Sequence, residues 1–76
     1  MDAPLYISIS VFDSRQNIVS HAMIWRDGSV DVGLKTKRRM STEEFAWWHS
    51  ECYAANLDVV YNVSRVGQPS HWYHAK

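Results

Sequence analysis

The segment HAMIWRDGSVDVGLK, residues 21–35, decides the fold because a hairpin signal lies between two alternating runs of apolar residues. Asp27-Gly28 is a dipeptide typical of two-residue type I′ turns, which need positive φ at both positions. The turn joins a predicted strand over residues 18–25 to another over about 29–35.

A two-residue loop also predicts the register of this hairpin. The expected facing pairs are Trp25 with Val30, Met23 with Val32, and His21 with Leu34. Together with Val19, these side chains form the predicted core face. The other side is more polar and is expected to face solvent; it carries Ser20, Ala22, Ile24, Asp31, Gly33 and Lys35.

On the N-terminal side of the hairpin, LYISISVF at residues 5–12 alternates between two faces. Leu5, Ile7, Ile9 and Val11 share one face, which is the pattern of a half-buried strand. The polar segment DSRQN at residues 13–17 is typical of a turn.

On the C-terminal side, Ser41 and Glu44 have the spacing of a helix capping box. The box predicts a helix over about residues 42–55, with Asn56 as a C-terminal cap. A fourth strand is predicted over residues 57–64.

These elements predict an α+β fold with the order β-β-β-α-β, in which one helix packs on one face of a four-stranded, mostly antiparallel sheet. We expect a right-handed crossover through the helix, with the fourth strand parallel to the first and third. The expected spatial order is 4-1-2-3, and 1-2-3-4 remains open. Lys35 and Lys37 would then protect the edge of the third strand.

Size and composition predict one domain, residues 1–76, with an ordered core over about 4–66 and an aromatic tail over 67–76. Eight basic and eight acidic side chains cancel, so the overall charge does not indicate a nucleic-acid binder. A single cysteine favours a reducing compartment. There is no signal-peptide pattern and no long apolar run, so we expect a cytoplasmic protein. We also expect no cofactor, because so small a core leaves little room for a large ligand cavity.

Two adjacent tryptophans on the predicted helix cannot both face one core. At 3.6 residues per turn, Trp48 shares the core stripe with Phe45 and Cys52. Trp47 lies on the opposite side, near Glu51. We weigh two explanations equally: the tail residues Trp72 and Tyr73 fold back over Trp47, or Trp47 anchors a partner or a second copy of the chain.

The basic run KTKRRM, residues 35–40, holds half of the basic side chains. Lys37, Arg38 and Arg39 are suited to an acidic or phosphate-rich partner. A solvated, edge-protecting loop is favoured over nucleic-acid binding, because the net charge is zero.

A metal site is a less favoured alternative. His49 and Cys52 are three residues apart on one helix face, and His71 and His74 have the same spacing in the tail. Zinc accepts such ligands. A lone helical cysteine is, however, more often a small apolar core residue, so no metal is expected.

The sequence contains no catalytic constellation, and its scattered glycines form no phosphate-binding loop, so we expect no enzyme. In size and format the chain resembles the small single-domain proteins that phages and mobile elements encode against host machinery, including anti-CRISPR proteins. The resemblance covers the whole chain but includes no diagnostic motif, so it transfers no site residues. It implies steric inhibition of a larger host protein or ribonucleoprotein complex in the host cytoplasm.

The residues themselves predict a protein-binding module. The candidate partner-binding residues are Trp47, Lys37, Arg38, Arg39, Glu51, Trp72 and Tyr73. Two alternatives are nucleic-acid binding through residues 35–39, and a homodimeric structural protein that uses Trp47 or the open face of the sheet.

Overall fold

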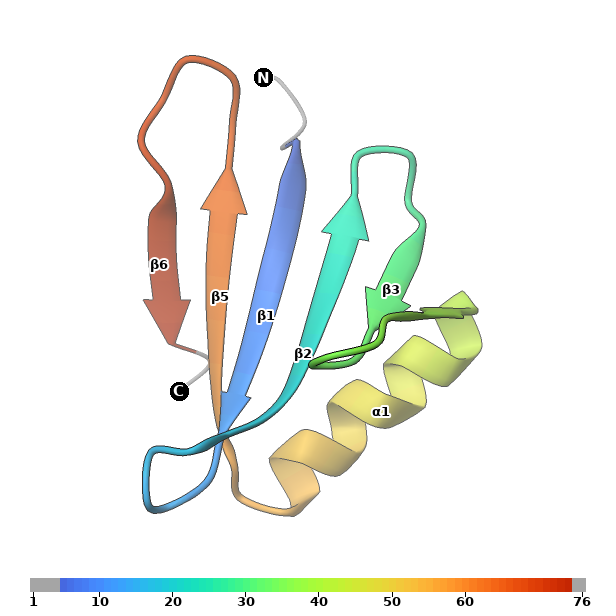
Figure 1. Ribbon diagram of the computed structural model, residues 1–76, viewed down its shortest axis with the longest axis vertical. Helices are drawn as coiled ribbons and strands as arrows, with labels where there is room; N and C mark the ends of the chain where they lie inside the picture. The colour runs from blue at the N-terminus through green and yellow to red at the C-terminus, as the bar shows by residue number, and fades with distance from the viewer. Residues whose placement is uncertain (1–4, 75–76) are drawn as a thin grey trace.

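A computed structural model describes residues 5–74, so the predicted ends of the domain lie outside the described residues. One helix packs on one face of a six-stranded sheet (Figure 1). In chain order the elements are β1 (Tyr6–Phe12), β2 (Ile18–Trp25), β3 (Val30–Val32), β4 (Arg38–Met40), α1 (Thr42–Ala54), β5 (Asp58–Ser64) and β6 (His71–His74).

The α+β class is confirmed, but the sheet has two more strands than the four that were predicted. Its order is β4-β3-β2-β1-β5-β6. The predicted order 4-1-2-3 corresponds to β5-β1-β2-β3 and is therefore confirmed. The extra strands, β4 and β6, extend the sheet at its two edges.

The predicted direction of the last core strand was wrong, because β5 pairs antiparallel with β1. The reason is β4, which lies in the basic run that was read as a solvated loop. Since β4 pairs antiparallel with β3, the chain has already reversed before it enters the helix. The helix then connects β4 to β5, and Lys37 precedes a paired strand rather than protecting a free edge.

The hairpin register differs by one residue from the prediction. Ile24 pairs with Val30, and the N–H of Trp25 donates to the carbonyl of Ser29 at 2.9 Å. The loop therefore contains three residues, with Gly28 in the left-handed region at φ 88°. A shift of one residue exchanges the two faces of a strand.

The register shift changes which side chains of β2 are buried. Ala22, fully buried, and Ile24 face the helix, whereas His21, Met23 and Trp25 lie on the opposite, open face. The prediction that His21 faces the core was therefore wrong.

The helix begins and ends as its flanking residues predict. The Ser41 hydroxyl accepts from the Glu44 N–H at 3.1 Å, and the Glu44 carboxylate accepts from the Ser41 N–H at 3.2 Å. At the other end, Asn56 has a left-handed φ of 59°. The N–H groups of Asn56 and Leu57 donate to the carbonyls of Tyr53 and Cys52, which closes a Schellman motif.

The core lies between α1 and the helix-facing side of the sheet. Its buried residues are Ile9, Val11, Ala22, Val30, Val32, Cys52 and Val59. Trp48 packs against this cluster and stacks on Phe45, with ring centroids 5.7 Å apart. The prediction that Trp48 is the structural tryptophan is confirmed.

Candidate functional site

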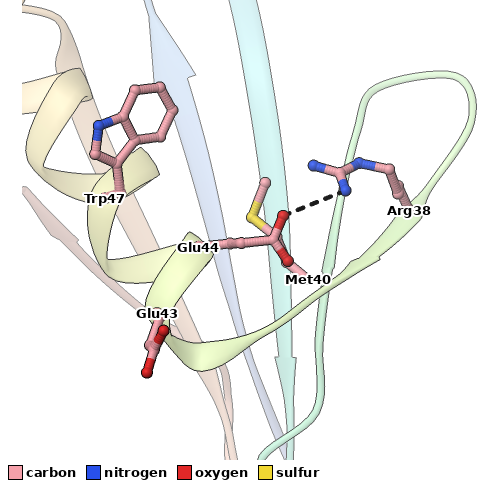
Figure 2. A pocket seen from close by; sticks show the side chains of 5 residues that line it. All are labelled: Arg38, Met40, Glu43, Glu44 and Trp47. Atoms are coloured by element: carbon pink, nitrogen blue, oxygen red, sulfur yellow. Dashed lines mark hydrogen bonds and ion pairs between the residues drawn. The ribbon is translucent and has the colours of Figure 1, made fainter.

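Beside α1, the surface contains a hollow of about 330 Å³, which we call the Trp47 hollow. It is lined by Arg38, Met40, Glu43, Glu44 and Trp47. Figure 2 shows the Trp47 indole on one side, the Arg38 guanidinium on the other and Met40 between them. Trp47 is 67% exposed, which makes it the most exposed large apolar side chain among residues 5–74.

Local sequence explains how these residues meet. Met40 ends β4 with its side chain half-buried against the core, and Ser41 starts the helix at the next position. The capping box then places Glu44 in the first turn, and Trp47 follows almost one turn later. The hollow therefore joins the last residues of an edge strand to the outer side of the helix start.

An ion pair closes one side of the Trp47 hollow. Arg38 Nη1 lies 3.5 Å from Glu44 Oε2, and both side chains are more than half exposed. Hydrogen bonds from the backbone and side chain of Ser41 lower the pKa of Glu44, and Arg38 adds a smaller contribution. Glu44 is therefore anionic at neutral pH and holds Arg38 at the rim.

The structure separates the predicted partner-binding residues into four places, one of which is the open face of the sheet with Lys37 and Arg39. Trp47 and Arg38 meet at the hollow, and Glu51 lies exposed further along the same helix. Trp72 and Tyr73 belong to β6, at the opposite edge of the sheet from β4. The tail therefore extends the sheet and does not cover Trp47.

The basic run does not form one patch. Arg39 Nε lies 2.8 Å from Asp31 Oδ1, on the open face of the sheet. Lys37 Nζ lies 2.6 Å from Nδ1 of His21 and donates to the carbonyl of Gly33 at 3.1 Å. With Arg38 bound to Glu44, all three cations are engaged within the chain.

A serine and a histidine do approach each other on the open face. His21 Nε2 lies 3.3 Å from the Ser8 hydroxyl. Because the Lys37 ammonium can only donate, Nδ1 of His21 must accept, and the proton lies on Nε2. Burial lowers the pKa of His21, and Lys37 lowers it further. The imidazole thus donates to Ser8 and has no free lone pair with which to take up the serine proton.

The four proposed metal ligands are not brought together. Cys52 is buried in the core, and His49 Nε2 forms a hydrogen bond with the Tyr61 hydroxyl. His71 and His74 lie on β6, where His74 is 3.5 Å from Asp58. Among residues 5–74 no three His, Cys, Asp or Glu side chains are grouped as metal ligands would be.

Sequence reasoning missed Met40, Glu43 and Glu44 as parts of the candidate site. The capping box was visible in the sequence. The role of Met40, however, depends on β4, whose three residues lie in a basic segment and show no recognisable strand pattern. Glu44 was read only as a helix-start residue, and Glu43 was not singled out.

No family model, curated protein or solved structure matches this chain. Within residues 5–74, no helix has the length and apolar character needed to cross a membrane.

Proposed function

We propose that this protein is a non-enzymatic protein-binding module that takes up an apolar side chain of its partner in the Trp47 hollow. The observation that carries the proposal is the 67% exposure of Trp47 next to Met40 and the Arg38–Glu44 ion pair. Binding of this kind would inhibit a larger protein or ribonucleoprotein complex by occupying its surface, as the small inhibitor format implies.

The chemistry of the hollow supports a protein partner. Binding hot spots are enriched in Trp and Arg and combine an apolar anchor with a surrounding polar rim. Here Trp47 and Met40 supply the apolar surface, and Arg38 and Glu44 supply the rim. A volume of about 330 Å³ is near the lower end for ligand pockets, which suits one protruding side chain.

Nucleic-acid binding through residues 35–39 has less support. Phosphate binding requires available cations, but Lys37, Arg38 and Arg39 each have a partner within the chain. The balanced net charge also removes long-range attraction to a polyanion.

The experiment compares two tryptophan variants. Trp47→Ala removes the wall of the hollow, and Trp72→Ala is the matched control because Trp72 is 64% exposed at the opposite edge of the sheet. A partner is captured from a host lysate with the wild-type chain, and binding of each variant is then measured by surface plasmon resonance. The protein is kept dilute so that self-association cannot contribute.

We expect Trp47→Ala to weaken binding by about thirtyfold or more, mostly through faster dissociation, and Trp72→Ala to bind like wild type. If the captured partner is an enzyme or an assembly, only Trp47→Ala should lose inhibition. The proposal is wrong if both folded variants bind equally well, or if the chain binds nucleic acid with a steep salt dependence instead.

A further inference from the structure

The outer edge of β6 is open for strand pairing. His71–His74 pair with β5 on one side, and no other strand of the described chain lies on the other side. Figure 1 shows β6 as the outermost strand, at the edge of the sheet that lies farther from α1. Natural edge strands are usually protected by being very short, or by lysine, proline, a bulge or an inward charge. The segment HWYH is a short strand of four residues, but it contains no lysine, proline or acidic residue.

This edge also exposes aromatic surface on both faces. Trp72 is 64% exposed and Tyr73 is 50% exposed. Trp72 pairs with Asn62 and lies on the open face, whereas Tyr73 pairs with Tyr61 and lies on the helix-facing side. A strand added here would cover apolar area on both sides of the sheet.

The other edge of the sheet is different. β4 carries Arg38 on one face and Arg39 on the other. Pairing of two copies through β4 would bring four guanidinium groups together. Pairing of β4 with β6 of another copy is head-to-tail, so it would extend without closing. Pairing of β6 with β6 is the arrangement that closes and brings no like charges of Arg, Lys, Asp or Glu into contact.

We propose that the β6 edge binds a second copy of this chain, antiparallel and about a two-fold axis perpendicular to the sheet. This axis leaves the two faces of the sheet unexchanged. Even-numbered residues of one copy must therefore lie opposite even-numbered residues of the other, and odd-numbered residues opposite odd-numbered ones. Two registers satisfy this condition and also pair three of the four β6 residues with one another: Trp72 opposite its own symmetry mate, or Tyr73 opposite its own symmetry mate. Either register buries aromatic side chains from both copies on both faces.

The dimer goes beyond the proposed function and does not depend on it. Because β4 and β6 are opposite edges, pairing through β6 leaves both Trp47 hollows open at the two outer ends of the joined sheet. A four-residue strand provides less contact than the ~800 Å² per partner of a stable interface. The dimer is therefore a weak, concentration-dependent one, and it would make the module bivalent.

Sedimentation measurements over a concentration series test this proposal. The wild-type chain should rise from its monomer mass of 8.8 kDa toward twice that value. Tyr73→Lys and Trp72→Lys each place a charge at the edge and should keep the chain monomeric. Trp47→Ala, which changes an equally exposed tryptophan elsewhere, should dimerise like wild type. Circular dichroism and thermal melting establish that each variant is folded.

Cysteine cross-linking tests the edge without relying on a destabilising charge. Cys52 is buried, so a new cysteine on the surface is the reactive one. Oxidation should cross-link either Trp72→Cys or Tyr73→Cys, depending on the register, and Arg39→Cys on β4 should remain uncross-linked. A wild-type chain that stays monomeric at the highest soluble concentration or sediments as open-ended polymers would overturn the proposal. Oxidation of the Arg39→Cys variant to a cross-linked dimer, which requires pairing through β4, would overturn it as well.

Discussion

Trp47 and Trp48 are adjacent in the chain but have opposite environments. Trp48 stacks on Phe45 with ring centroids 5.7 Å apart and packs against the core, whereas Trp47 is 67% exposed. One residue on a helix turns a side chain by about 100°, so a single step is enough to separate a structural role from a surface role.

This relationship predicts unequal costs for two similar substitutions. Trp48→Ala should lower the free energy of unfolding by about 3 kcal/mol, because it leaves a cavity beside Phe45. Trp47→Ala should change it by less than about 0.5 kcal/mol, as for an ordinary surface position. Urea denaturation of both variants measures the difference. Equal losses would show that the exposed indole supports the fold.

Two glycines in turns predict different losses of stability when each is replaced by alanine. Gly28 has positive φ, but a Cβ added there would meet nothing within 4 Å, so Gly28→Ala should cost about 1 kcal/mol. Gly33 has φ 143°, and a Cβ there would lie 2.0 Å from the carbonyl oxygen of Thr36. Gly33→Ala should therefore cost at least about 2 kcal/mol. Thermal melting compares the two, and a smaller loss for Gly33→Ala would mean that the β3–β4 loop moves readily.

The two partly buried histidines predict a loss of stability in mild acid. Burial lowers the pKa of both His21 and His49 from the ordinary value of 6.5. The unfolded chain therefore binds protons at a pH where these folded imidazoles do not. The stability that these two neutral imidazoles contribute is therefore fully present above about pH 6.5. It is lost as the pH decreases toward the lowered pKa values of the folded state.

Denaturant titration at a series of pH values between neutrality and mild acid measures this effect. His49→Gln should flatten the dependence, because it removes one of the two protonation sites. An unchanged slope for His49→Gln would contradict the assignment.

The single cysteine predicts slow thiol chemistry. Cys52 is 6% exposed, and burial, with a smaller contribution from Glu51, raises the pKa of its thiol. The thiolate is the reactive species, so a disulfide reagent should react slowly with the folded chain and rapidly in denaturant. Trp48→Ala should speed the reaction, because it loosens the packing around the helix. A fast reaction of the native wild-type protein would mean that the helix opens frequently.

The sequence by itself determined the features that depend on neighbouring residues. Ser41 and Glu44 specify the start of the helix through two local hydrogen bonds, and Asn56 allows the left-handed turn that ends it. The 3.6-residue period separated Trp48 from Trp47, and the strand alternation of β1 was read correctly. These interactions span a few residues, so their patterns are visible in the sequence.

Only the tertiary structure decided the hairpin register, the two edge strands and the composition of the site. Asp27-Gly28 suits a three-residue loop as well as a two-residue one, and the choice places Ala22 and Ile24 in the core instead of His21. β4 and β6 contain three and four residues, too few for a period to be recognised. Such strands form because a neighbouring strand offers unpaired backbone groups, and that partner lies elsewhere in the chain.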